Sequence, residues 1–233
     1  MTIAKHMKNI GKNLTDIHQQ IERAAIDYNR LPGDITLLAV SKKKPAADIR
    51  LAYQFGQRDF GENYLQEAQS KMAELANLDI VWHFIGPIQS NKTRALATSF
   101  DWVHCVDRRK IAQRLNDQRP ESMPPLNICI QVNVDLETSK SGVAASEVIG
   151  LAEGLRNMPN IRLRGLMAIP AQRDDFDSQR KPFSLLAGLL EDLQQQDFDC
   201  DTLSMGMSHD MQAAIAEGST LLRIGTAIFG ERI

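Results

Sequence analysis

The sequence has few cysteines, no long apolar run and almost no excess charge. Its three cysteines, Cys105, Cys129 and Cys200, are widely spaced, and none forms a CxxC or Cys/His pair with metal-ligand spacing. A disulfide framework and a zinc site are therefore not expected, and a reducing cytoplasm is the expected compartment. No segment approaches the roughly 18 apolar residues of a membrane span, and the N-terminus lacks the apolar stretch of a secretory signal.

The charges are nearly balanced, with 27 Lys and Arg against 29 Asp and Glu and a net charge of −2. The basic residues are dispersed, and the run at residues 42–44 is too short for a nucleic-acid patch. Neither nucleic acid nor a membrane is therefore an expected partner. No linker rich in Pro, Gly or Ser divides the 233 residues, which predicts a single domain over residues 1–233.

An amphipathic pattern opens the chain. Steps of four and three residues place one set of apolar side chains on a single helix face: Ile3, Met7, Ile10, Leu14, Ile17 and Ile21. This predicts a packing helix over about residues 3–30. A basic targeting peptide is the alternative, but Asp16 and Glu22 on the polar side weaken it.

Strand-like and helix-like segments then alternate to the end of the chain. The predicted strands are residues 35–41, 59–61, 81–85, 102–106, 126–134, 161–169, 202–205 and 221–224. The predicted helices are residues 46–55, 64–75, 91–98, 109–116, 145–155, 182–195 and 211–216. Such alternation is typical of parallel strands with helical crossovers, and about eight units favour a closed (β/α)8 TIM barrel over an open doubly wound sheet. The polar residues 171–181 are the predicted mobile stretch.

Lys42 stands where the first predicted strand ends, within Ser41-Lys42-Lys43-Lys44-Pro45. The carboxyl ends of barrel strands converge on one face, where active sites form. A lysine forms a Schiff base only as the neutral amine, so its pKa must fall from roughly 10.4. Partial burial and the cations Lys43 and Lys44 act in that direction. A solvated lysine at a helix entry is the plain alternative, and Lys44 is the reserve candidate because side chains alternate near a strand end.

Two glycine-bearing turns near the C-terminus predict a phosphate site. Ser204, Gly206 and Ser208 belong to the first turn, and Gly225 and Thr226 to the second. Ser208 is expected to cap the next helix, Gly225 lets the backbone approach a ligand, and Thr226 adds a hydroxyl. Barrels often bind phosphate after strands seven and eight. Ordinary turn glycines and a capping serine are the alternative. A lysine facing a phosphate site points to pyridoxal 5'-phosphate (PLP).

Arg223 lies inside the last predicted strand, where an inward guanidinium needs a partner. That partner is either a carboxylate or the pyridine nitrogen of the cofactor. Because arginine keeps its proton, the second arrangement would leave the ring nitrogen unprotonated and limit carbanion chemistry.

Four further features lie within the predicted strands or just after them. Asn63 is placed either to hydrogen-bond the phenolic side of the ring or to cap a helix, and strand six carries Met167. His83 is either a cofactor contact or a satisfied core histidine. The segment at residues 139–142 is either a basic loop near the mouth or a plain surface turn.

Seven sequence blocks together resemble one known family. They are residues 39–42 (AVSK), 60–64 (FGENY), 82–86 (WHFIG), 89–92 (QSNK), 164–167 (RGLM), 203–208 (LSMGMS) with Asp210, and 223–226 (RIGT) with 229–230 (FG). The chain is identified by these blocks as similar to the YggS/PROSC family of pyridoxal phosphate homeostasis proteins, and the resemblance covers nearly its whole length.

The resemblance implies a barrel like the N-terminal domain of alanine racemase, of PLP fold type III, with PLP as an aldimine on Lys42. It implies phosphate contacts from residues 204–208 and 225–226, and Arg223 at the ring nitrogen. No residue matches the tyrosine that the racemase's second domain supplies as an acid/base. The family is therefore expected to hold PLP and deliver it to apoenzymes, with amino acids as further exchange partners and a monomer as the default state.

Three other functions remain open from the sequence. A fold type III amino-acid racemase is the main alternative. Racemisation removes a proton from one face of the substrate and delivers one to the other face; Lys42 can act on one face, and no residue is a good candidate for the opposite face. A Schiff-base aldolase would be colourless, unlike a PLP protein. A scaffold that binds partner proteins would use the ligand only structurally.

Overall fold

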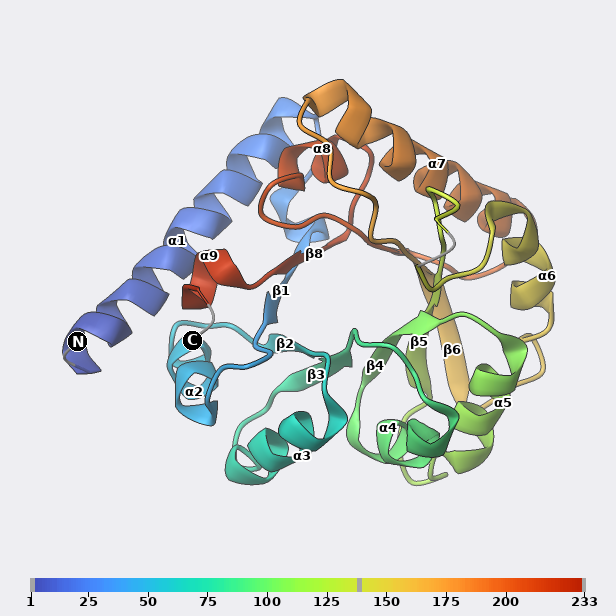
Figure 1. Ribbon diagram of the computed structural model, residues 1–233, viewed down its shortest axis with the longest axis horizontal. Coiled ribbons are helices and arrows are strands. Elements are labelled where there is room, and N and C mark those ends of the chain that lie inside the picture. Colours follow the sequence, from blue (N-terminus) through green and yellow to red (C-terminus); the bar gives the residue numbers. More distant parts are fainter. Residues whose placement is uncertain (1–2, 138–139, 232–233) are drawn as a thin grey trace.

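The computed structural model describes residues 3–137 and 140–231 of the chain. Within them, eight parallel strands close into a barrel in chain order (Figure 1). The strands are Thr36–Val40 (β1), Asp59–Glu62 (β2), Val81–Phe84 (β3), Trp102–Val106 (β4), Leu126–Gln131 (β5), Ile161–Met167 (β6), Thr202–Ser204 (β7) and Leu221–Ile224 (β8). The predicted (β/α)8 barrel is confirmed, and the open-sheet alternative is wrong because β1 pairs with β8.

Helices follow the strands on the outside of the barrel (Figure 1). The α-helices are Ile3–Asp27 (α1), Ala46–Gln54 (α2), Leu65–Glu74 (α3), Thr93–Ser99 (α4), Arg109–Gln118 (α5), Val148–Glu153 (α6), Phe176–Gln195 (α7), Met211–Ala216 (α8) and Thr226–Phe229 (α9). Short 3-10 helices occupy Pro32–Asp34, Ser90–Lys92 and Ala145–Glu147.

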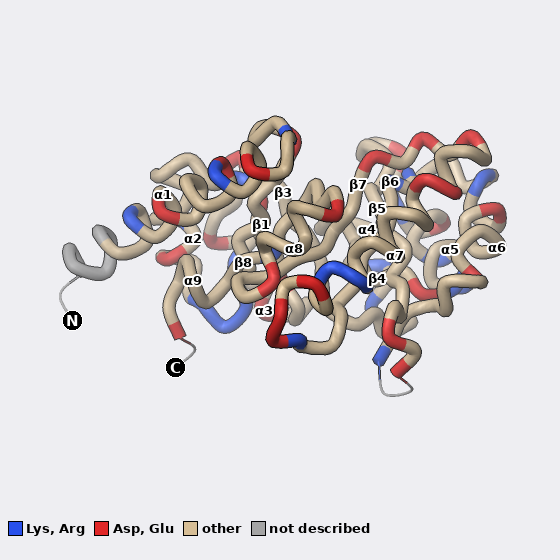
Figure 2. The backbone as a smooth tube through the Cα atoms, turned by 90° about the horizontal axis from the view of Figure 1, so that it is seen from above, with Lys and Arg blue, Asp and Glu red and all other residues tan. Residues whose placement is uncertain are grey.

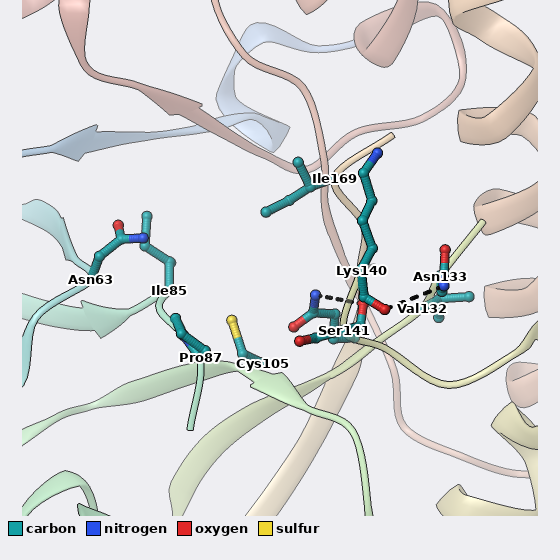
Figure 3. A pocket seen from close by; sticks show the side chains of 10 residues that line it. Asn63, Ile85, Pro87, Cys105, Val132, Asn133, Lys140, Ser141 and Ile169 are labelled. Carbon is teal, nitrogen blue, oxygen red and sulfur yellow. Dashed lines mark hydrogen bonds between the residues drawn. The ribbon is translucent and has the colours of Figure 1, made fainter. Parts of the chain in front are cut away.

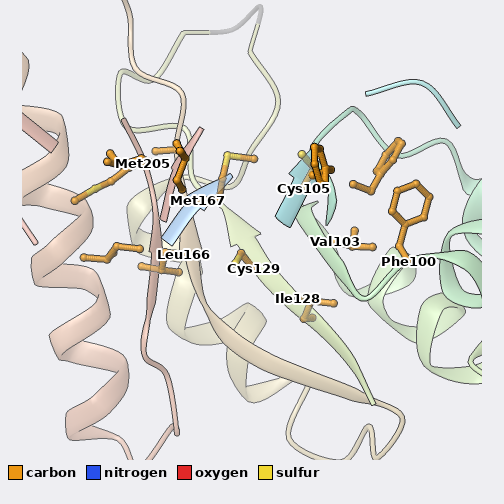
Figure 4. Packing of buried hydrophobic residues seen from close by; sticks show 14 of the residues in the cluster. Phe100, Val103, Cys105, Ile128, Cys129, Leu166, Met167 and Met205 are labelled. Atoms are coloured by element: carbon orange, nitrogen blue, oxygen red, sulfur yellow. The ribbon is translucent and has the colours of Figure 1, made fainter. Parts of the chain in front are cut away.

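Most strand residues are buried, because both faces of a parallel barrel strand are covered. In β5, Ile128, Cys129 and Ile130 are fully buried, and Leu166 and Met167 of β6 lie beside them (Figure 4). Aliphatic side chains of this kind fill a barrel interior in layers, so the polar residues that occur among them stand out.

Helix α1 packs across the seam where the barrel closes. It contacts α2, α8 and α9, which flank β1 and β8 (Figure 1). Ile10, Leu14, Ile17 and Ile21 are buried on its inner face, as the steps of four and three residues predict. The helix ends at Asp27, and Asn29 just beyond it has a φ of 55°, a left-handed conformation common after helix ends.

Helix α7 differs most from the predicted boundaries. It begins at Phe176 rather than at residue 182, so the second half of the segment expected to be mobile is helical. The Asp175 side chain accepts a hydrogen bond from Ser178 N at 2.8 Å and caps the helix. The polar first turns hid this cap in the sequence, and Pro182, which lies inside the helix, looked like a start.

Basic and acidic residues are interspersed over the elements (Figure 2). None of the helices in the described ranges is long and apolar enough to cross a membrane. Among the same residues, no three His, Cys, Asp or Glu side chains are grouped to hold a metal ion.

Candidate functional site

A cavity of about 300 Å³ lies at the carboxyl ends of β1 and β8. Seven of the ten residues predicted to bind the cofactor line it: Lys42, Asn63, Met167, Ser208, Arg223, Gly225 and Thr226. The remaining lining residues are Val40, Ile85, Ile169, Met207 and His209. The barrel closure therefore gathers residues from both ends of the sequence around one space.

The turn after β1 carries Lys42 into this cavity. Lys44 N donates to Ser41 O at 3.0 Å, and Lys43 has a φ of 61° with its N–H donating to Glu67 Oε1 at 2.5 Å. The Lys44 ammonium instead donates to Phe229 O at 3.1 Å, on the C-terminal segment. The geometry thus favours Lys42 over the reserve candidate Lys44.

A buried ion pair supports that turn, and the sequence reading missed it. Lys71 Nζ donates to Glu62 Oε1 at 2.7 Å and to Ser41 O at 2.8 Å. Ser41 Oγ donates to the same carboxylate oxygen at 2.6 Å. Burial raises the pKa of Glu62, and the Lys71 ammonium opposes that rise. The main chain of Ser41, next to Lys42, is therefore held by charged groups.

Arg223 lies at the base of the cavity with its guanidinium bonded to neutral groups. It donates to Ser204 Oγ at 2.8 Å, to Ser204 O, and to Ala168 O at 2.8 Å. None of the ion pairs among the described residues involves Arg223. Burial lowers the pKa of its guanidinium, but an arginine stays charged at accessible pH. A charged donor at a cavity wall suits a ligand atom that accepts a hydrogen bond.

The predicted phosphate end is built by two turns, with one correction. Ser208 and Thr226 are exposed and line the cavity. The expectation that Ser208 caps α8 is wrong: Asp210 precedes the helix, and its Oδ1 accepts from Met207 N at 2.6 Å. At Gly225 a Cβ would lie 3.0 Å from Val40 O, so the close approach needed there is to β1.

Three of the predicted residues lie outside the cavity lining. His83 points into the barrel interior, where its Nδ1 lies 2.9 Å from Nε2 of His104. Ser204 is fully buried beneath Arg223, and Gly206 O accepts the Arg223 N–H at 3.0 Å. His104 was missed because an isolated histidine in an apolar strand looks like any core histidine.

A neighbouring cavity of about 270 Å³ shares Asn63, Ile85 and Ile169 with the first (Figure 3). Lys140 and Ser141, of the segment singled out in the sequence, line it, whereas Ser139 lies outside the described residues. The Lys140 ammonium pairs with Glu137 at 2.7 Å.

The residues around the first cavity fit PLP chemically. Lys42 supplies an amine for an aldehyde, Arg223 a donor for a ring nitrogen, and the two turns supply hydroxyl groups for a phosphate. The Asn63 Oδ1 atom is buried and accepts no hydrogen bond from the described part of the chain. A bound group that reaches Asn63 would satisfy it.

Comparison with known proteins places the chain in a family. The family described as alanine racemase, N-terminal domain, matches residues 15–233. A Pseudomonas aeruginosa protein named pyridoxal phosphate homeostasis protein is 56% identical over 226 residues, which cover 97% of both chains. The protein of the same name from Escherichia coli K12 is 50% identical, covering 97% of this chain and 98% of its own.

Solved structures agree with that placement. PipY of Synechococcus elongatus PCC7942, solved with PLP bound, is 36% identical with a TM-score of 0.83, covering 95% of this chain and 100% of its own. Alanine racemase from Corynebacterium glutamicum shares the fold, with a TM-score of 0.71 at 16% identity, and the match covers 60% of that chain. The chain belongs to the alanine racemase N-terminal domain family and, within it, to the pyridoxal phosphate homeostasis proteins. The resemblance and the fold predicted from the sequence are both confirmed.

Proposed function

We propose that this chain binds PLP as a Schiff base on Lys42 and takes part in the homeostasis of that cofactor in the cytoplasm. The observation that carries the proposal is that Lys42 and Arg223 line one cavity together with both predicted phosphate turns. The curated relatives named above are pyridoxal phosphate homeostasis proteins, and PipY was solved with PLP bound, which supports the same ligand here.

Each side chain has a defined task in this proposal. The neutral Lys42 amine adds to the aldehyde carbon and one water leaves, so attachment is reversible. Ser208, Gly225 and Thr226 bind the phosphate, and Arg223 donates to the ring nitrogen. PLP supplies a reactive aldehyde, and one amine bound to its carbon can be replaced by another.

Reversible attachment suits a carrier. Amino acids or PLP-dependent apoenzymes would receive the cofactor by exchange with the Lys42 amine, and we propose that the chain does so as a monomer. Transfer assays test this step: release of PLP should be faster with an apoenzyme present than by dissociation alone. Equal rates would remove delivery from the proposal while leaving binding intact.

The test of binding is borohydride reduction of PLP-saturated protein followed by peptide mass spectrometry. The wild type should carry the reduced adduct on the peptide containing Lys42 and absorb visible light before reduction. Lys42→Ala should lose both signals, whereas the matched control Lys44→Ala should keep them, because Lys44 points to the C-terminal segment. An adduct that persists in Lys42→Ala would reject the assignment.

A further inference from the structure

A row of polar side chains crosses the otherwise apolar barrel interior. Asp59 Oδ1 lies 3.0 Å from His83 Nε2, and His83 Nδ1 lies 2.9 Å from His104 Nε2. His104 Nδ1 lies 2.8 Å from Ser204 Oγ, which accepts from Arg223 NH1 at 2.8 Å. We call these five residues the transbarrel chain.

The two ends of the transbarrel chain open on different cavities. Arg223 lines the cavity that contains Lys42. Asp59 and His83 line a cavity of about 200 Å³ at the amino end of the barrel. The Asp59 side chain is 27% exposed there, whereas His83 is only 1% exposed. Asp59 therefore keeps contact with solvent while the histidines are sealed inside.

When His83 is neutral, Asp59 fixes the direction of the hydrogen bonds that follow it. A carboxylate only accepts, so His83 must donate from Nε2, and a neutral His83 then accepts at Nδ1. His104 must therefore donate from Nε2 and accept at Nδ1. Burial, followed by the electrostatic effects of His83 and then of Arg223, holds the pKa of His104 well below its usual value, which keeps that ring neutral.

The Arg223 end is compatible with the same direction. A guanidinium only donates, so Ser204 Oγ accepts from it and keeps its own hydrogen to donate to His104 Nδ1. With both histidines neutral, the four hydrogen bonds run one way, from a cation to an anion. Hydrogen bonds aligned in this manner polarise one another in a low-dielectric interior.

We propose that Asp59 is the counter-charge of Arg223 and acts through this one-way chain. His83, His104 and Ser204 are positioning residues that transmit the charge and fix the guanidinium. The arrangement gives Arg223, which is 5% exposed, a counter-charge although no carboxylate of the described residues pairs with it directly.

Other charges near the two ends define the controls. Asp210 attracts Arg223 through space, but its carboxylate is bonded to Met207 N and is not part of the chain. Asp201 lines the same amino-end cavity as Asp59, but its carboxylate is paired with Arg164. Asp201 is thus a carboxylate in the same cavity with no hydrogen bond to the transbarrel chain.

The consequence for the ligand rests on the proposed function. A remote anion offsets part of the positive potential that Arg223 presents to an anionic cofactor. Asn at position 59 keeps the acceptor oxygen but removes the charge, so the cavity becomes more positive. PLP should then bind about three- to tenfold tighter, the range for a partly buried charge pair at an effective dielectric constant near 20.

The first experiment reads the histidine tautomers by 15N NMR in the protein without ligand, so it does not depend on PLP. Substituting Gln for His6, His18 and His209 leaves only the two histidines of the transbarrel chain. Both should carry hydrogen on Nε2 and none on Nδ1. A ring protonated on Nδ1, alone or in addition, would overturn the one-way chain.

The second experiment titrates PLP into wild type, Asp59→Asn and Asp201→Asn by absorbance. Tighter binding in Asp59→Asn with less than a twofold change in Asp201→Asn supports the proposal. Weaker or unchanged binding in Asp59→Asn, or an equal gain in both variants, overturns it. If no form binds PLP while the tautomers are as expected, the proposed function fails but the one-way chain stands.

Discussion

The charged side chains at the two ends of the barrel have different hydrogen-bond partners. At the amino end, Arg164 is paired with Asp201, and the Asp59 carboxylate accepts from His83. At the carboxyl end, the Arg223 guanidinium is bonded to neutral oxygens, and hydroxyl and amide groups line the cavity. The amino end thus pairs its arginine directly with a carboxylate, whereas the carboxyl end holds Arg223 by neutral oxygens and presents it to a cavity. That difference marks which end suits an anionic ligand.

The largest expected effect concerns the buried pair that supports the carboxyl end. Lys71→Ala leaves the Glu62 carboxylate buried without its ammonium, so the free energy of unfolding should fall by about 3–5 kcal/mol. Urea unfolding measures it. Adding Glu62→Gln should recover part of the loss, because the uncompensated charge is then gone. A loss below about 1 kcal/mol, as exposed pairs give, would mean the pair is effectively solvated.

The next largest loss of stability is expected from backbone crowding at the carboxyl end. A Cβ at Gly86 would lie 2.2 Å from Asn63 O, so Gly86→Ala must displace the segment that carries Asn63. We expect a loss of about 1–3 kcal/mol in stability, and weaker PLP binding by titration. Gly33→Ala at the amino end is the matched control, since nothing lies within 4 Å of its Cβ. Equal effects of the two variants would contradict the difference between the ends.

The smallest change in the free energy of unfolding is expected for a substitution at the amino end, Asp201→Asn. Burial raises the pKa of Asp201, but hydrogen bonds from Arg164 and Thr202 outweigh it and hold the pKa below 3.8. A depressed carboxyl pKa stabilises the fold above the unfolded pKa, and that stability is lost as pH falls through the folded pKa. Asp201→Asn should therefore cost about 0.2–1 kcal/mol at pH 7, and less below about pH 4. Urea unfolding at both pH values checks the sign, and a cost that grows on acidification would refute it.

The barrel could be predicted from the sequence because most strands are short and rich in apolar residues, and helix-like segments alternate with them. The strand ends then pointed to Lys42, Arg223 and Thr226, since a closed barrel brings all such ends to one face. The predicted boundaries of the helices and strands were less accurate than their order. The start of α7 at Phe176 was missed because its first turns are polar and the capping Asp175 sits in a run of charges.

The interior polar groups could not be predicted because they depend on which strands face one another. His83 and His104 meet across β3 and β4, and Ser204 reaches them from β7. Nothing in the spacing of these residues reports that contact. Lys71 had a usable signal: it shares the helix face of the buried Ala68 and Leu75, where an unpaired ammonium would be costly.

Barrel closure also has a consequence for the order of events during synthesis. The seam joins β1 to β8, with Leu38 opposite Arg223, and α1 covers it by packing on α8 and α9. Contacts this distant in sequence form late, because the intervening loop must close first. A nascent chain that still lacks β8 has Lys42 but no seam and no Arg223. Under the proposed function, the cavity that would hold PLP is therefore complete only after β8 has emerged and the barrel has closed.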